Sequence, residues 1–398
     1  MLKTISKIVL FILFIQCTSE NERDESLSAY LIDPEPEFAI NFIREQSFGS
    51  EDSIITGRMG GFAVDKMDRV FLVDGDQYMV HIFQSDGKYI TSIGRGGDGP
   101  GEFISSPVPQ VIENVLFLFD PMQFRLHSYS TDTFEFLQTQ NLNPRNQSDI
   151  EDLAGYRPSK VFFRNNDRFV VLFSQTIQTD KNHPRYNADS LYDLYYMMDS
   201  DGTILSNQIL KLKGRNFLSA NVGGENKHSH FLFLGTSIAT VSEDGYIYSG
   251  WSQDFFIEAM NSDGEYKRSY YYPFEKVPLT RDHALKSVES IPYPDAVEYL
   301  QSVIINSSNE DLPETWPALN DLLVDDENRL WVSTIVKDFD IYEWWVLENT
   351  GELITKFEWP RNEPIEVVKN GYIYTRETDE ETGLHQVVRY RILFEEVN

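Results

Sequence analysis

The sequence has one cysteine, Cys17, in 398 residues, so no disulfide can form within the chain. It has no GxSxG, HExxH, CxxC or P-loop pattern, and therefore no signature that would fix a reaction. Basic residues are also scarce, because 34 Lys and Arg stand against 63 Asp and Glu, giving a formal charge of −29. Repulsion from this charge makes nucleic acids and anionic lipid surfaces poor partners.

Aromatic residues and turn formers are abundant instead, with 27 Phe, 21 Tyr, 23 Gly and 17 Pro. This composition favours an all-β fold of many short strands. Residues 60–103 contain one complete unit of such a fold. Its expected strands are residues 62–64, 69–73, 79–83 and 89–93, and Gly87 supplies the positive φ of the last hairpin turn. The glycine-rich residues 94–101 exclude a helix or strand and predict a crossing loop, so the unit indicates one blade of a β-propeller.

The second strand of this unit recurs along the chain, each time after Asp or Asn and after a short apolar run that predicts an innermost strand. The six copies begin at Asp68, Asn114, Asp167, Asp244, Asn328 and Asn370. The third and fourth intervals exceed the ~40–50 residues of a blade and predict insertions. One is the polar stretch 175–190, between the second and third strands of blade 3. The other is helical, beginning at the cap Thr280 and continuing over residues 295–305.

The sixth copy ends without an outermost strand, whereas the apolar run Phe38 to Ile43 stands unclaimed before the first copy. We expect this run to pair beside Val387 to Leu393 and close the ring, because closure removes exposed sheet edges. The fold class predicted is thus an all-β, six-bladed propeller of four-stranded antiparallel blades, closed by an N-terminal strand, with a short helical insertion in blade 4.

The N-terminus predicts export. Lys3 and Lys7 precede an apolar run over residues 8–15 that is too short to span a bilayer and stops near Cys17. This arrangement resembles a bacterial lipoprotein signal, in which the cysteine is lipidated; an ordinary signal peptide or anchor with a chance cysteine is the alternative. The expected organisation is a signal over residues 1–17, a disordered tether over 18–37 and the propeller over 38–398. The tether, where Ser precedes acidic residues, resembles the surface-export tethers of some Gram-negative lipoproteins.

The linker from Ile93 to Phe103, with its GxGPGEF sequence, resembles the inter-blade signature of NHL-type propellers. The mature chain is similar to the six-bladed β-propeller lipoproteins of Gram-negative bacteria, over about residues 38 to 394. The resemblance implies a lipid-anchored protein on the periplasmic or surface side of the outer membrane. We expect the linker glycines to be structural, with Phe103 packing between blades.

Two functions are open. The first is a ligand-binding or protein-binding scaffold without a cofactor. Its ligand-binding candidates are basic residues: Arg58, Arg157 and Lys160 near the inner strands, and Arg95 in the crossing loop. A converging basic patch would bind a carboxylate or acidic sugar, whereas pairing of each residue with a neighbouring acid is the alternative. The second function is a propeller-type lyase or lactonase. The resemblance would then require Ca²⁺ or another divalent cation in the central channel, and the candidate residues are Asn320, Asp321 and Glu366.

Two further clusters are interpreted as structural. His228 and His230 could supply two metal ligands from one face of a strand, but no third His or Cys lies nearby in the sequence. A structural pair is therefore favoured. The run from Asp325 to Glu327 is expected to be a solvated hairpin tip, with calcium as the alternative.

Overall fold

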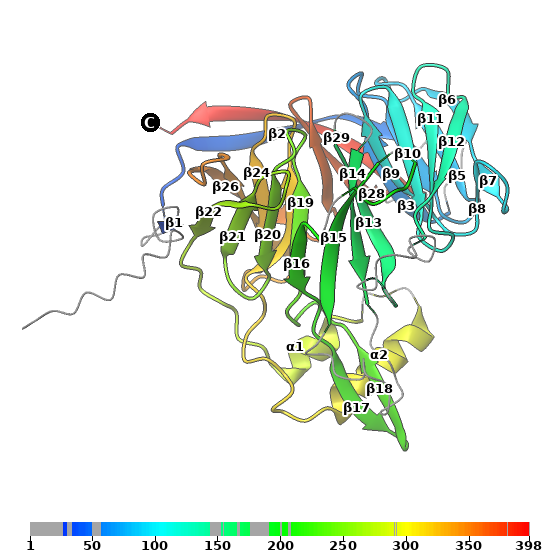
Figure 1. Cartoon of the computed structure of the whole chain (residues 1–398). Coiled ribbons are helices and arrows are strands. Elements are labelled where there is room, and N and C mark those ends of the chain that lie inside the picture. The colour runs from blue at the N-terminus through cyan, green and yellow to red at the C-terminus, as the bar shows by residue number, and fades with distance from the viewer. Residues whose placement is uncertain are drawn as a thin grey trace, which may run out of the picture.

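The computed structural model describes residues 27–29, 34–49, 57–143, 153, 155–164, 168–175, 191–199, 201–205, 208–289, 291, 293–379 and 381–397. In this part of the chain six antiparallel sheets surround a central axis, and each is one blade (Figure 1). Both the all-β class and the number of blades predicted from the sequence are therefore confirmed.

The first three blades follow one another along the chain, each ordered from the axis outward. Blade 1 is β3 (Met59–Val64), β4 (Val70–Asp74), β5 (Met79–Phe83) and β6 (Tyr89–Ile93). Blade 2 is β9 (Val108–Ile112), β10 (Val115–Asp120), β11 (Arg125–Ser130) and β12 (Phe136–Asn141). Blade 3 is β13 (Arg157–Arg164), β14 (Arg168–Ser174), β15 (Tyr192–Asp199) and β16 (Leu210–Lys213). The blade 1 strands lie within a few residues of the predicted ones.

The remaining blades continue the same order. Blade 4 is β19 (Ser237–Val241), β20 (Ile247–Trp251), β21 (Phe256–Met260) and β22 (Tyr266–Tyr271). Blade 5 is β23 (Leu319–Val324), β24 (Leu330–Thr334), β25 (Ile341–Leu347) and β26 (Leu353–Pro360). Blade 6 is β27 (Ile365–Lys369), β28 (Tyr372–Thr378), β29 (His385–Glu396) and, outermost, β2 (Phe38–Phe48).

The N-terminal strand closes the ring as predicted. β2 pairs antiparallel with β29, in a register that places Phe38 opposite Glu396 and Phe48 opposite Val387. Phe48 is fully buried in a cluster that joins blade 6 to blade 1. Side chains add to this seam, because Asn370 Nδ2 donates to the Asp65 carbonyl and Arg376 Nη1 donates to the Met59 carbonyl. The first and last segments of the propeller are thus held together by backbone and side-chain bonds.

The apolar core is divided among the blade interfaces. Each of six buried clusters draws on two neighbouring blades, and together they complete the circle. Aromatic side chains fill these interfaces, and Tyr270 and Tyr272 of blade 4 also donate hydrogen bonds to the Asn349 and Gly351 carbonyls of blade 5. The aromatic-rich composition therefore serves to fill the wedges between twisted sheets.

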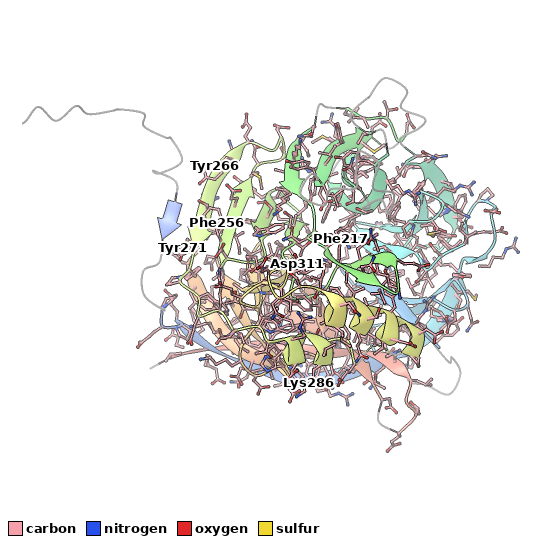
Figure 2. The ribbon with its side chains drawn as sticks, turned by 90° about the horizontal axis from the view of Figure 1, so that it is seen from below. Phe217, Phe256, Tyr266, Tyr271, Lys286 and Asp311 are labelled. Atoms are coloured by element: carbon pink, nitrogen blue, oxygen red, sulfur yellow. The ribbon has the colours of Figure 1, made fainter. Side chains whose placement is uncertain are left out.

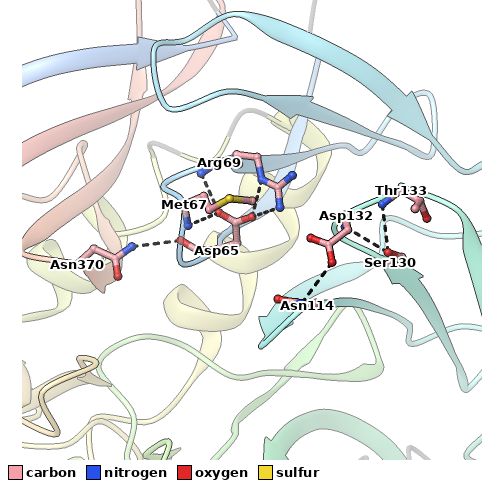
Figure 3. Close-up of polar contacts among 8 residues, drawn as sticks. All are labelled: Asp65, Met67, Arg69, Asn114, Ser130, Asp132, Thr133 and Asn370. Carbon is pink, nitrogen blue, oxygen red and sulfur yellow. Dashed lines mark hydrogen bonds and ion pairs between the residues drawn. The ribbon is translucent and has the colours of Figure 1, made fainter.

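The turns between first and second strands use left-handed backbone, as the Asp and Asn anchors predict. Asp68, Asn328 and Asn370 have φ of 58°, 62° and 55°. In blade 2, however, Glu113 takes this conformation, one residue before the predicted Asn114, and in blade 4 Gly245 takes it, one residue after the predicted Asp244. Figure 3 shows the blade 1 corner, where the Asp65 carboxylate accepts from the backbone N–H groups of Met67 and Arg69. Asp167 lies outside the described residues.

Phe103 packs between blades, as expected, but the glycine-rich linker is not free of strands, contrary to the prediction from the sequence. It contains the short parallel strands β7 (Arg95–Gly96) and β8 (Glu102–Phe103), and Phe103 is fully buried between blades 1 and 2. Gly101 has φ of 74°, and a Cβ there would lie 2.6 Å from the Tyr129 hydroxyl. A side chain at this position would therefore clash as well as strain the backbone.

An arm projects from one face of the disc (Figure 1). It consists of a hairpin between blades 3 and 4 and two helices between blades 4 and 5: β17 (Leu218–Val222), β18 (Glu225–Ser229), α1 (Arg281–Lys286) and α2 (Pro294–Asn306). Figure 2 views the disc from this side and shows both helices lying across it. Thr280 caps α1 through its side chain, as predicted. The hairpin was not predicted, although Gly223-Gly224 is a two-residue turn signal.

Part of the expected tether is ordered. β1 (Leu27–Ala29) pairs in parallel with β22 and becomes a fifth strand at the outer edge of blade 4. Residues 1–26, which include the expected signal, lie outside the described residues, as do residues 176–190 of the blade 3 insertion. Within the described ranges, no helix is long and apolar enough to cross a membrane.

Candidate functional site

The two faces of the disc differ in their connections. On one face the chain turns by tight corners and hairpins, such as those at Asp68 and Gly87. On the other face it crosses from the outermost strand of one blade to the innermost strand of the next. This crossing face carries the glycine-rich linker, the arm and the ends of β14 and β15 that flank the polar insertion. Long connections on a rigid scaffold are where binding sites usually form, so the crossing face is the candidate functional face.

A cavity of about 330 Å³ occupies the central channel and is lined by all six innermost strands. Its wall combines apolar and polar surface, and charged side chains stand at several levels along it. Lys160, Asp321 and Glu366 lie on the halves of β13, β23 and β27 toward the crossing face, whereas Glu243, Asp326 and Lys369 lie toward the opposite face. The channel thus has one charged group of residues near each mouth.

A second cavity of about 340 Å³ lies between blades 5 and 6, and we call it the groove. Asn320, Asp321, Leu323 and Glu366 line it on the axial side, and Asp321, Leu323 and Glu366 also line the channel. The outer side of the groove is aromatic and prolyl: Tyr342, Trp344, Trp359, Pro360 and Pro364. Channel and groove therefore adjoin at Asp321, Leu323 and Glu366 near the crossing face, and we call this region, with its polar inner side and apolar outer side, the mouth.

Asp321 is the most perturbed carboxylate of this mouth. Surrounding protein atoms raise its pKa above the usual range, although the residue as a whole stays exposed to solvent in the channel. The positive charge of Lys160 and a hydrogen bond from the Leu322 N–H (2.9 Å) act in the opposite direction on this pKa. Burial also raises the pKa of Tyr342, and the Asp321 charge adds to this effect, as expected if the two groups are close.

The other polar groups of the mouth have defined partners. Glu366 Oε1 lies 2.7 Å from Arg376 Nε, and Asn320 Nδ2 donates to Ser333 Oγ at 3.1 Å. The structure therefore brings together Asn320, Asp321 and Glu366, the three residues proposed from the sequence for a channel cation. It also places Lys160 and Arg376 near them. Within the described ranges, no group of three or more His, Cys, Asp or Glu could hold a metal ion.

The basic candidates from the sequence lie in different places. Lys160 lines the channel, with its ammonium 4.8 Å from the centre of the Phe162 ring. Arg58 donates to the Gly75 carbonyl at 2.9 Å and lies 3.4 Å from Asp76, and Arg95 pairs with Glu102 in the exposed linker. Arg157 begins β13 and is exposed. Of these four residues, only Lys160 lines the cavities described here, and Arg58 and Arg95 are paired with acids.

The two clusters interpreted as structural lie in the arm and at the first corner of blade 5. His228 and His230 flank Phe217 on the hairpin of the arm, and burial lowers the pKa of both. Asp325 is buried rather than solvated, which corrects the expected hairpin tip. Its carboxylate accepts hydrogen bonds from Arg329 Nε and Trp331 Nε1, while Asp326 and Glu327 are exposed. The sequence DxxxR therefore predicts a buried corner here, as it does at Asp65.

One arrangement resembles a catalytic triad. His81 Nδ1 lies 2.7 Å from Ser92 Oγ, and its Nε2 lies 3.6 Å from Asp74. The same positions in blade 2 hold Asp120, His127 and Thr139, with His127 Nδ1 2.8 Å from the threonine hydroxyl. Burial lowers the pKa of both histidines, to about 4 for His127. A repeated, buried and neutral arrangement is typical of a structural element rather than of an active site.

Sequence reasoning missed the aromatic side of the mouth. Tyr342 and Trp344 lie on β25 and Trp359 lies near the end of β26, in the third and fourth strands of blade 5. Alternation along β25 could have assigned Tyr342 and Trp344 to one face of the sheet. Nothing in the spacing indicates that the wedge between blades 5 and 6 stays open beside them, because this depends on the summed volumes of side chains from both blades.

Comparison with known proteins agrees with this architecture. A family model described as a 6-bladed beta-propeller matches residues 49–213, which hold blades 1 to 3. None of the curated proteins matches the chain. Among solved structures, the chain is similar to a Bacteroides fragilis protein named as a candidate exported protein, with 11% identity and a TM-score of 0.50, over 93% of this chain and 99% of that one.

Two further structures are similar at lower TM-scores. A Bacteroides thetaiotaomicron protein of unknown function shares 11% identity with a TM-score of 0.45, over 90% of this chain and 77% of that one. Virginiamycin B lyase from Staphylococcus aureus shares 10% identity with a TM-score of 0.41, over 90% and 100%. Fold, sheet order and the first of these structures define the class: the chain is a six-bladed β-propeller. At such identities the likeness concerns the fold alone.

Proposed function

We propose that the protein is an extracytoplasmic binding protein that takes a small-molecule or glycan ligand at the mouth shared by the channel and the groove. The observation that carries this proposal is the mouth itself: two cavities of about 330 and 340 Å³ meet at Asp321 and Glu366. These volumes lie at the low end of the range of small-molecule sites, which combine a mostly apolar wall with a few polar groups. The arm on the same face offers a second surface for a protein partner.

Export and anchoring are proposed from the sequence. The basic and apolar residues before Cys17 favour a lipoprotein signal, and lipid on Cys17 would hold the propeller at the outer membrane, on its periplasmic or surface side. Replacing the residue by Cys17→Ser should move the protein from the membrane fraction to the soluble fraction of the cell envelope. Retention of the variant in the membrane would favour an uncleaved apolar anchor instead.

The charges of the mouth support binding over cation-dependent catalysis. Lys160 and Arg376 stand beside Asp321 and Glu366, so the positive and negative charges balance. A divalent cation at this place would have to compete with two resident cations for the same carboxylates. Of the basic residues predicted from the sequence, Lys160 is the one that lines the channel. A small-molecule or glycan ligand in the channel would meet Lys160, which would attract an anionic group of that ligand.

The alternative is a propeller-type lyase or lactonase. One observation favours it: Asn320, Asp321 and Glu366 converge on the groove and carry the oxygen ligands that Ca²⁺ prefers. Metal analysis of the purified chain from residue 26 onward, after dialysis against Ca²⁺ at micromolar concentration, separates the two functions. The binding function predicts much less than one divalent cation per chain. Stoichiometric metal that disappears in Asp321→Asn would overturn it in favour of the enzyme.

A further inference from the structure

The groove has a chemical character that narrows the ligand. Its outer side is lined by two largely buried indole rings, a phenol and two prolines, and the tryptophans are part of a packed aromatic cluster. Trp359 Nε1 donates to the Glu363 carbonyl, and the Trp359 ring contacts Tyr390 edge to face with centroids 5.3 Å apart. These contacts fix the aromatic wall, so a ligand meets a rigid apolar surface.

The axial side of the groove presents hydrogen-bonding groups at the same level. Asp321 and Glu366 offer carboxylate oxygens, and Tyr342 lines the same cavity. Arg361 stacks on the Tyr342 ring, with its guanidinium carbon 4.4 Å from the ring centre, and thereby holds the ring in place. Acceptors and an aromatic wall thus face one space.

The charged side chains in and beside the groove disfavour several classes of ligand. An anion in the groove would face the carboxylates of Asp321 and Glu366. A cation would compete for the same carboxylates with Lys160, whose charge acts on Asp321, and with Arg376, which is paired with Glu366. A purely apolar ligand would leave the carboxylates desolvated without partners, which is costly. A saccharide ring avoids all three conflicts, because its C–H face packs on aromatic rings while its hydroxyl edge donates to carboxylates.

We propose that the groove between blades 5 and 6 is a binding subsite for a neutral saccharide ring, packed against the Tyr342 ring and hydrogen-bonded by Asp321 and Glu366. The inference rests on the proposed function, since it names the ligand class of the same mouth. A saccharide chain extending from the groove would continue into the channel past Lys160, where a carboxylate-bearing unit would find its counter-charge.

The test is calorimetric titration of the chain with a panel of neutral trisaccharides, namely cellotriose, maltotriose, mannotriose and xylotriose, with sorbitol as the open-chain control. We expect at least one trisaccharide to bind below about 10 mM, and sorbitol not to bind. Asp321→Asn should weaken binding about tenfold or more, because a hydrogen bond to a charged group is lost. Tyr342→Leu should weaken it to a similar degree by removing the aromatic face.

The matched control is Asp326→Asn. Asp326 also lines the channel, but it follows the other end of β23, at the opposite mouth of the channel. This substitution should leave affinity within about twofold of wild type, and thermal unfolding of each variant establishes that it is folded. Binding by no member of the panel, or equal affinity in Asp321→Asn, Tyr342→Leu and wild type, overturns the saccharide subsite. Galacturonate binding that requires Lys160 but not Tyr342 would also overturn it while leaving the proposed binding function intact.

Discussion

Buried polar residues in this propeller act by stabilising corners and seams. Asp65 and Asp325 occupy equivalent corners in blades 1 and 5, and each accepts two backbone N–H groups and one arginine Nε. His81 and His127 occupy equivalent places on the third strands of blades 1 and 2. The repetition means that each residue's role can be inferred from its copy, which separates scaffold groups from those of the mouth.

His127 makes the free energy of unfolding depend on pH. Burial lowers its pKa from 6.5 to about 4, so the unfolded chain takes up the proton more readily than the folded chain. Its contribution to stability is full above pH 6.5 and is lost as the pH falls through the folded pKa, up to about 3 kcal/mol. His127→Asn retains an acceptor for the Gly101 N–H, and should lose less free energy of unfolding than wild type between pH 7 and about pH 4.5.

Denaturant unfolding at the two pH values measures this difference. His385→Asn, at a partly exposed position near the start of β29, is the matched control and should lose as much stability on acidification as wild type. If His127→Asn and wild type lose equal stability, the titration of His127 does not account for acid sensitivity.

At the scale of elements, β2 has the greatest consequence for the fold. It supplies the outermost strand of blade 6, so its removal would expose the edge of β29 and open the seam to blade 1. Deleting residues 26–48 should therefore yield an insoluble or aggregating product. A soluble, cooperatively unfolding deletion product would show that closure by β2 is dispensable.

Point substitutions on this strand give a finer test. Phe48→Ala removes a fully buried ring and should cost about 3–5 kcal/mol in free energy of unfolding. Ile43→Ala lies on the same strand with 47% of its surface exposed and should change stability by about 0.5 kcal/mol or less. Chemical denaturation of both variants compares them. Equal losses would contradict the packing of β2 against blade 1.

The elements that repeat were the predictable ones. Apolar runs before each Asp or Asn, such as Asn328 and Asn370, identified the inner strands, and the runs after them identified the second strands. Both recur because the same wedge between blades must be filled each time. Closure followed from one missing strand and one unclaimed run. The β17–β18 hairpin was missed because its alternation is short and polar, and β1 because a three-residue edge strand has no periodicity to detect.

The site was less predictable than the fold. Asn320, Asp321 and Glu366 were identified because they flank inner strands, which converge on one axis. Arg58 was misleading for the same reason, since flanking an inner strand does not decide whether a side chain turns toward the channel or pairs with Asp76. Arg95 follows the outermost strand of blade 1 and pairs with Glu102 in the linker. The aromatic wall depends on long-range packing between blades 5 and 6, which local patterns do not encode.

At the scale of the whole molecule, the chain separates its tasks between two faces. Tight corners hold one face, and the other carries the arm, the long connections and the mouth. The formal charge of −29 favours solubility and discourages binding to anionic surfaces. At the mouth, by contrast, Lys160 and Arg376 balance Asp321 and Glu366, which suits a neutral or mixed ligand.

The central claim is that ligand binds on the crossing face at the mouth between blades 5 and 6. Backbone amide hydrogen exchange of the chain, with and without the tightest-binding trisaccharide of the panel at about 10 mM, tests it most directly. We predict slower exchange at the start of β23, in the first half of β25 and over residues 359–366. Unchanged exchange there, or slowing confined to the corners at Asp65 and Asp325 on the opposite face, would contradict the claim.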